Sequence, residues 1–211
     1  MNRVEITENE IHAQAGALLS VIANRAMEAE LTGFEFAAGI PGTLGGACVM
    51  NAGAYGGEMK DVLETVTVLT RDGDVKTLTK DELELGYRTS VIAKKDYIAL
   101  SAVIRLENGK KEEIKAVMDD LKEKRITKQP LEYPSAGSTF KRPEGYFAGK
   151  LIQDAGLRGF QVGGAQVSEK HCGFVVNKDQ ATAADVMNLM NQVSDNCLLY
   201  TSDAADDLIG V

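Results

Sequence analysis

Four separated segments hold the residues whose types and spacing suggest chemistry. Residues 39–46 (GIPGTLGG) and 51–57 (NAGAYGG) are rich in glycine, whereas residues 134–143 and 163–177 carry hydroxyl, cationic and imidazole side chains. Because glycine lets a backbone N–H approach an anion closely, the first two segments are able to hold a pyrophosphate without a lysine. They are neither a dinucleotide-binding G-x-G-x-x-G nor a P-loop. A tight turn between packed elements remains the alternative interpretation.

Individual side chains of these segments, and of a further segment at 86–90 (GYRTS), suit particular roles. Arg88, directly after Tyr87, has the fork geometry that binds a carboxylate through two hydrogen bonds. Ser138 suits a proton donor if its hydroxyl faces a carbanion. The loop around it, with the cations Lys141 and Arg142, suits an anion, and the adjacent Lys170 and His171 suit contacts with phosphate. Taken singly, each has a structural alternative: a surface arginine, a turn-rich loop, and a histidine satisfied within the fold. A serine hydrolase is disfavoured because no G-x-S-x-G segment is present.

Periodicity predicts the elements that must position these residues. Alternating apolar residues predict strands near residues 4–13, and the turn RDGD at 71–74 predicts a hairpin between two flanking strands. Thr79 and Asp81 are predicted to cap a short helix through Leu85. The further predicted strands are 98–106, 160–167 and 173–176, and the predicted helices are 17–27, 110–127, 146–155 and 183–193, the last capped by Thr182.

Composition excludes several function classes. The 211 residues are 44% hydrophobic and 26% charged, as in ordinary globular domains. The net charge of −8 disfavours nucleic acid as a partner, and no apolar run is long enough to span a membrane. The three cysteines and two histidines show no metal-ligand spacing, so no metal is expected. The cysteine pattern suits a reducing cytoplasm.

Taken together and in order, the motifs resemble those of the UDP-N-acetylenolpyruvoylglucosamine reductase (MurB) family. The resemblance covers about residues 1–195 and rests on five segments of this sequence: GIPGTLGG at 39–46, MNAGAYGG at 50–57, YRTS at 87–90, AGSTFKRP at 136–143 and VSEKHCGFVVN at 167–177.

The resemblance implies an α+β fold. A partial FAD-binding domain of the vanillyl-alcohol-oxidase-like (PCMH) type is expected at residues 1–109, followed by a connecting helix at 110–128. A smaller α/β substrate-binding domain is expected at 129–196. Residues 197–211 are interpreted as an atypical tail foreign to the family.

The resemblance also implies the reaction and its residues. NADPH reduces FAD, which passes hydride to the enolpyruvyl group of UDP-N-acetylglucosamine enolpyruvate, giving UDP-N-acetylmuramate for peptidoglycan synthesis. Ser138 matches the serine that supplies a proton, and Arg88 matches the arginine that stabilises the enolate. Tyr87, Lys141 and His171 are the expected substrate contacts, and a monomer is favoured. The expected FAD contacts are Gly39, Ile40, Pro41, Gly42, Thr43, Gly45, Gly46, Asn51, Ala52, Gly53, Ala54 and Tyr55.

Two departures from the family pattern bear on activity. The family carries a further flavin-binding loop before the point that matches Met1, and a catalytic glutamate near its end. Here no glutamate follows Glu169. Impaired FAD binding and weak or no turnover are therefore expected. A non-catalytic nucleotide-sugar-binding remnant and another FAD-linked oxidase of the same superfold remain as alternatives.

Overall fold

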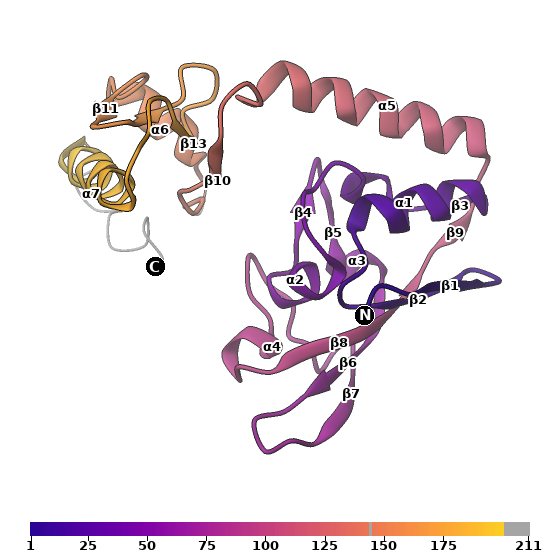
Figure 1. Ribbon diagram of the computed structural model, residues 1–211. Helices are drawn as coiled ribbons and strands as arrows, with labels where there is room; N and C mark the ends of the chain where they lie inside the picture. Colours follow the sequence, from indigo (N-terminus) through magenta and orange to yellow (C-terminus); the bar gives the residue numbers. More distant parts are fainter. Residues whose placement is uncertain (144, 201–211) are drawn as a thin grey trace. The chain divides into compact units, whose positions relative to one another are not determined.

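The computed structural model describes residues 1–143 and 145–200, and the chain forms two compact units, Met1–Glu123 and Lys124–Val211 (Figure 1). The boundary between the units falls inside helix α5 (Lys111–Lys128). The boundaries predicted from the sequence, after residues 109 and 128, lie at the two ends of that helix. Of the predicted tail, residues 201–211 lie outside the described residues.

The first unit combines a five-stranded sheet with short helices and two small ribbons. Its elements before α5 are β1 (Val4–Thr7), β2 (Glu10–Gln14), α1 (Leu19–Glu28), β3 (Leu31–Thr32), the 3-10 helix η1 (Glu35–Ala37), α2 (Leu44–Val49), β4 (Gly53–Ala54), β5 (Gly57–Glu58), α3 (Met59–Val62), β6 (Leu63–Leu69), β7 (Val75–Thr79), α4 (Val91–Lys94), β8 (Ile98–Arg105) and β9 (Glu107–Asn108).

The main sheet runs β1-β2-β8-β6-β7 with every neighbouring pair antiparallel. In the register of this sheet, Ile104 of β8 lies opposite Ile11 of β2 on one side and opposite Leu63 of β6 on the other. All three side chains are buried. Their neighbours along the strands point to the opposite face, where Arg105 pairs with Glu10. Because side chains alternate across a strand, one face of the sheet forms the core under α2, which packs on β8. The predicted strands 4–13 and the hairpin around 71–74 are confirmed.

The predicted short helix after Thr79 is wrong. Residues 80–84 form consecutive turns, and Glu84 has φ +46°, a left-handed conformation that no α-helix continues. Thr79 does contact the expected region, since its amide and hydroxyl both donate to Glu82 at 2.8 Å. The hydrogen bonds of a helix cap are therefore present. No helix follows, because Leu83 is buried and its carbonyl accepts from the Val91 amide, which holds the segment as a turn.

The second unit is built on a four-stranded antiparallel sheet of order β10-β13-β12-β11. After the end of α5 its elements are β10 (Ser135–Ser138), α6 (Ala148–Asp154), β11 (Gln161–Val162), β12 (Ala165–Val167), β13 (Phe174–Asn177) and α7 (Ala183–Tyr200). Helix α7 packs on β11 and β12, and α6 packs on α7. The predicted strand 173–176 and the two predicted helices of this region are confirmed. The single strand predicted at 160–167 is instead a hairpin, because a turn at Gly163 and Gly164 divides it into the antiparallel strands β11 and β12.

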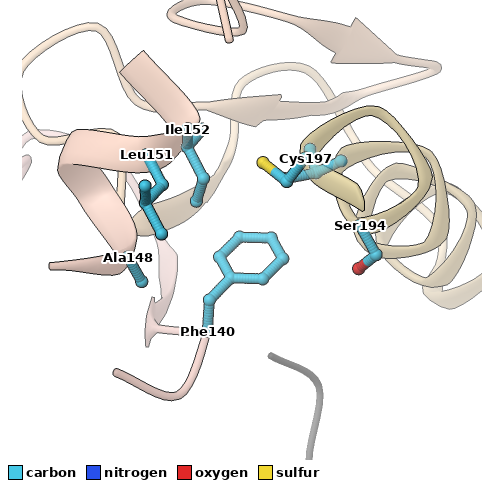
Figure 2. A pocket seen from close by; sticks show the side chains of 7 residues that line it. Phe140, Ala148, Leu151, Ile152, Ser194 and Cys197 are labelled. Carbon is cyan, nitrogen blue, oxygen red and sulfur yellow. The ribbon is translucent and has the colours of Figure 1, made fainter. Parts of the chain in front are cut away.

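Between α6 and α7 lies an apolar pocket (Figure 2). Phe140 stands in it, facing Leu151 and Ile152 of α6 on one side and Cys197 of α7 on the other. Ser194 also lines the pocket, but its hydroxyl donates to the Met190 carbonyl at 2.8 Å and so adds no unsatisfied polar group. Cys197, where the atypical tail was predicted to begin, is helical and buried in this core.

Thr182 caps α7 as the sequence predicts. Its hydroxyl accepts from the Asp185 amide at 3.1 Å, and its own amide donates to the Asp185 carboxylate at 2.8 Å. Thr182→Ala is expected to lower the free energy of unfolding of the second unit by about 1 kcal/mol. Urea denaturation should show this loss, with Thr182→Ser retaining most of the stability. An unchanged midpoint for Thr182→Ala would contradict the capping role.

The same cap makes the second unit sensitive to acid. The hydrogen bond from the Thr182 amide, followed by that from its side chain, lowers the pKa of the Asp185 carboxyl. A lowered carboxyl pKa in the folded state stabilises the fold above the ordinary Asp range. This contribution is lost as pH falls through the lowered value.

Among the helices of residues 1–143 and 145–200, none has the length and apolar character needed to cross a bilayer.

Candidate functional site

The glycine-rich segment 39–46 enters a helix rather than remaining a loop. Helix α2 begins at Leu44, and the amides of Leu44 and Gly45 already donate to the carbonyls of Ala17 and Ala15, at 2.9 and 2.8 Å. These two N–H groups are therefore used to fasten the segment to the chain after β2. The amide of Gly46 has no backbone acceptor within the described ranges, so it is one of the N–H groups of this segment that can meet an anion.

The glycines of the two segments divide into packed and open positions. A Cβ on Gly45 would lie 2.9 Å from the Cβ of Ala15, and one on Gly57 would lie 2.7 Å from the Phe36 ring. At Gly42 and Gly46, by contrast, no atom lies within 4 Å of an added Cβ. The packed glycines allow close approach within the protein, whereas the open glycines leave backbone accessible to a ligand.

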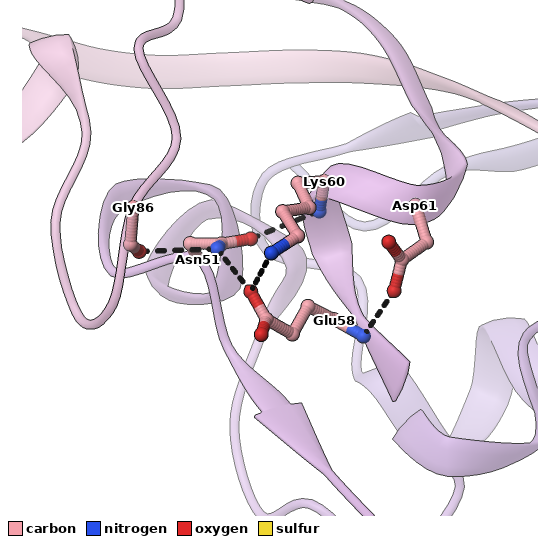
Figure 3. Close-up of polar contacts among 5 residues, drawn as sticks. All are labelled: Asn51, Glu58, Lys60, Asp61 and Gly86. Atoms are coloured by element: carbon pink, nitrogen blue, oxygen red, sulfur yellow. Dashed lines mark hydrogen bonds and ion pairs between the residues drawn. The ribbon is translucent and has the colours of Figure 1, made fainter. Parts of the chain in front are cut away.

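Asn51 holds the second glycine-rich segment together (Figure 3). It is buried and has φ +44°. Its side-chain Nδ2 donates to Glu58 Oε2 at 2.7 Å and to the Gly86 carbonyl at 3.1 Å, and its Oδ1 accepts from the Lys60 amide at 2.9 Å. Lys60 Nζ lies 3.2 Å from the same Glu58 oxygen. Both Nδ2 donors of Asn51, predicted as a cofactor contact, are thus used within the protein.

Arg88 lies at the tip of a two-residue turn close to this segment. Gly86 and Thr89 exchange backbone hydrogen bonds of 3.1 and 3.3 Å, and Arg88 between them has φ +55°. Its Nη2 lies 3.4 Å from the Gly53 carbonyl, and its guanidinium lies 5.6 Å from the centre of the Tyr87 ring. Arg88 is exposed and Tyr87 is 56% exposed, so this turn carries a cation and an aromatic ring at the surface of the first unit.

The remaining predicted FAD contacts differ in accessibility. Ala52 is buried, whereas Tyr55 is 44% exposed and has φ +54°. The positions that are at least partly accessible are Gly39, Ile40, Pro41, Gly42, Thr43, Gly46, Gly53, Ala54 and Tyr55, and the buried ones are Gly45, Asn51 and Ala52. The first group is able to touch a cofactor directly, and the second supports the backbone beneath it.

In the second unit, Ser138 ends the edge strand β10. Gly137, with φ +82°, marks a bulge in the pairing of β10 with β13, and Ser138 lies opposite Phe174. Its hydroxyl is exposed and makes no hydrogen bond within residues 1–143 and 145–200. The nearby Ser135 behaves differently, since its Oγ donates to the Val175 carbonyl at 3.0 Å and accepts from the Gly137 amide at 2.9 Å. Ser138 is therefore available for chemistry, whereas Ser135 supports the bulge.

His171 lies in the turn that leads into β13. Its Nδ1 accepts from the Gly173 amide at 3.1 Å. Its ring packs edge-on against the Phe174 ring, with 4.9 Å between the two ring centres. In the neutral imidazole the proton then resides on Nε2, which is left as a donor for a ligand. Lys141 is exposed and makes no ion pair within the described part of the chain. Ser138 and His171 flank Phe174, which is the arrangement that the sequence left undetermined.

Sequence reasoning missed two side chains of the first unit. Glu58 bridges Asn51 and Lys60, and Ser90 is fully buried, donating from its hydroxyl to the Val49 carbonyl at 2.6 Å. The position of Ser90 just before α4 is a signal for a helix cap, which it provides by accepting from Ala93. Glu58 precedes α3 and forms a capping box with Asp61, three residues later, so its position also carried a local signal for a helix start.

Metal binding and thiol chemistry depend on the His, Cys, Asp and Glu side chains of residues 1–143 and 145–200. Within the described ranges, no three His, Cys, Asp or Glu side chains gather as metal ligands. Burial raises the pKa of the Cys48 thiol to about 12, and burial also raises the pKa of Cys172. Both thiols are therefore protonated at neutral pH and unsuited to nucleophilic roles.

Comparison with known proteins assigns these units to a family. Residues 129–198 match the family described as UDP-N-acetylenolpyruvoylglucosamine reductase, C-terminal domain, and residues 1–79 match an FAD binding domain. The crystal structure of UDP-N-acetylenolpyruvylglucosamine reductase (MurB) from Thermus caldophilus superposes with a TM-score of 0.80 at 39% identity, covering 87% of this chain and 68% of that chain. The chain belongs to the MurB family. The resemblance seen in the sequence is thus confirmed, as is the α+β fold of a PCMH-type FAD domain with a smaller α/β domain.

Curated MurB relatives are more similar in sequence. The UDP-N-acetylenolpyruvoylglucosamine reductase of Agathobacter rectalis is 65% identical over 188 residues, or 89% of this chain and 60% of that protein. The reductase of Clostridioides difficile is 58% identical over 189 residues, or 90% of this chain and 62% of that protein. The chain spans about 60% of the length of these MurB relatives.

Proposed function

We propose that this chain serves the NADPH-dependent, FAD-mediated reduction of UDP-N-acetylglucosamine enolpyruvate to UDP-N-acetylmuramate in peptidoglycan synthesis. The observation that carries the proposal is the accessible Ser138 hydroxyl, without an internal partner among described residues, in a unit that matches the reductase C-terminal domain. The names of the relatives agree with this reaction. The proposal covers an oxidoreductase with small-molecule substrates.

FAD fits the residues of the first unit. The open backbone at Gly42 and Gly46 leaves room that a Cβ would fill, and the Gly46 amide is available to a phosphate or ring oxygen. Tyr55, 44% exposed, offers an aromatic face beside the same segment. Bound FAD would supply the hydride that the reaction needs.

The chain's own residues would orient the substrate and manage its charge. Arg88, exposed and held at the tip of its turn, is placed to bind the enolpyruvyl carboxylate and to stabilise negative charge that develops beside it. Ser138 would deliver a proton from its hydroxyl to the carbon next to that carboxylate. We assign Lys141, the Nε2 of His171 and Tyr87 to contacts with the sugar nucleotide.

NADPH as the reductant and a cytoplasmic location are part of the same proposal. The thiols of Cys48 and Cys172 are free and buried, which suits a reducing compartment.

The direct test is spectroscopic. The purified chain, mixed with FAD and freed of excess cofactor, should retain a flavin absorbance band, and anaerobic NADPH should bleach it. Adding UDP-N-acetylglucosamine enolpyruvate should restore the band in proportion to the UDP-N-acetylmuramate formed. Retention and bleaching without recovery would contradict the proposed substrate. Calorimetric binding of the sugar nucleotide without flavin uptake would instead favour the non-catalytic binding remnant.

A further inference from the structure

We propose that Asn51 and Ser90 are positioning residues that fix the turn carrying Arg88, so that the guanidinium meets the substrate carboxylate in one orientation. The inference rests on the proposed function for the role of Arg88. It assigns to Asn51 a task different from direct contact with a cofactor. Neither side chain needs to touch a ligand for this task.

Three contacts tie residues 86–90 to residues 49–53. At the start of the turn, Asn51 Nδ2 donates to the Gly86 carbonyl at 3.1 Å (Figure 3). At its end, the Ser90 hydroxyl donates to the Val49 carbonyl at 2.6 Å. At its tip, Arg88 Nη2 lies 3.4 Å from the Gly53 carbonyl, the longest of the three contacts. The two short contacts therefore hold the backbone, and the guanidinium itself keeps only a weak internal bond.

Burial strengthens the two hydrogen bonds made by the Asn51 and Ser90 side chains. Asn51 is 2% exposed and Ser90 is fully buried, so water does not compete for either hydrogen bond. The second N–H of Asn51 is held by Glu58 at 2.7 Å, and its Oδ1 by the Lys60 amide. These contacts leave the amide group a single orientation, which points one N–H at Gly86.

The turn needs such support because Arg88 is strained. Its φ of +55° is a conformation that residues with a side chain adopt uncommonly. Without the ties, Arg88 would relax toward ordinary backbone conformations and the direction of its side chain would change. A misplaced guanidinium binds a carboxylate by one hydrogen bond instead of two, which weakens charge stabilisation.

Hydrogen exchange of the flavin-free chain tests the ties without reference to activity. Asn51→Ala should speed exchange of the Gly86 and Thr89 amides about tenfold, while amides of the 70–74 hairpin stay unchanged. Thr70→Val is the matched control, because buried Thr70 supports that other turn by accepting from the Asp74 amide at 3.2 Å. It should speed exchange at Asp74 only. Uniformly faster exchange across the first unit in Asn51→Ala would overturn the proposal.

A double-mutant cycle then links the ties to Arg88. In the FAD-loaded chain, Asn51→Ala should slow recovery of the flavin band by the enolpyruvyl substrate about tenfold or more, with bleaching by NADPH unchanged. In an Arg88→Ala background the same substitution should change the rate less than twofold, because there is no guanidinium left to position. Equal losses in both backgrounds would overturn the inference.

Two further outcomes are distinguishable. Arg88→Ala that recovers the flavin band at the normal rate overturns the role proposed for Arg88 and, with it, this inference. Should Asn51→Ala fail to fold, Ser90→Ala removes the other tie together with the cap on the Ala93 amide. It must speed exchange at Gly86 and Thr89, besides Ala93, and show the same dependence on Arg88. If Ser90→Ala slows recovery of the flavin band by the same factor with and without Arg88→Ala, the inference is overturned as well.

Discussion

Ser138→Ala is expected to slow reduction of the enolpyruvyl substrate by about 10²–10⁴-fold, the range that one positioned proton donor contributes. The reason is that the Ser138 hydroxyl is exposed at the end of β10 and has no internal partner within the described residues. Its loss removes the proton source while leaving the fold untouched. Stopped-flow recovery of the flavin band in FAD-loaded protein measures the effect, and bleaching by NADPH should keep its rate.

Ser135→Ala is the matched control for that experiment. Ser135 lies on the same strand, but its Oγ makes two hydrogen bonds that hold the bulge before Ser138. Its replacement should lower the free energy of unfolding by about 1 kcal/mol and change the rate far less. If Ser135→Ala and Ser138→Ala slow the reaction equally, Ser138 is a structural residue and its role as proton donor is wrong.

Gly46→Ala is expected to weaken FAD binding about 10–100-fold without harming the fold. A methyl group at this position fills space that the protein leaves empty, since no atom lies within 4 Å of an added Cβ. The added methyl group would instead displace FAD from close contact with the backbone. This should make the free energy of FAD binding less favourable by about 1–3 kcal/mol. The helix itself gains from alanine, by up to about 1 kcal/mol. FAD titration by fluorescence and thermal unfolding separate the two effects.

Gly45→Ala, at the neighbouring position, is expected to lower the stability of the fold, unlike Gly46→Ala. Its Cβ would lie 2.9 Å from the Ala15 Cβ and 3.2 Å from the Ala15 carbonyl oxygen, so α2 must shift away from the chain after β2. Overpacking of this kind costs about 1–3 kcal/mol of stability. The proposed flavin site predicts that Gly45→Ala lowers stability and Gly46→Ala does not. If both variants keep normal FAD affinity, segment 39–46 is not the flavin site.

The sequence determined the family, the α+β class and most elements of this protein. Alternating strands such as residues 4–13, the RDGD hairpin and the Thr182 cap depend on neighbours within a few positions, so local rules suffice for them. Five ordered motifs likewise identified the MurB family without any knowledge of distances, and the comparisons confirmed it.

Tertiary structure decided which residues of those motifs are accessible and which are internal supports. Gly45 and Gly46 are identical in type and adjacent, yet one is packed against Ala15 and the other is open. Asn51 looks like a ligand contact in its motif, but its donors are used by Glu58 and by Gly86, 35 residues away. The segment after Thr79 has capping residues but forms turns, because Leu83 is bonded to Val91. In each case a deciding neighbour lies beyond the few positions that a local pattern describes, so such patterns carry no information about it.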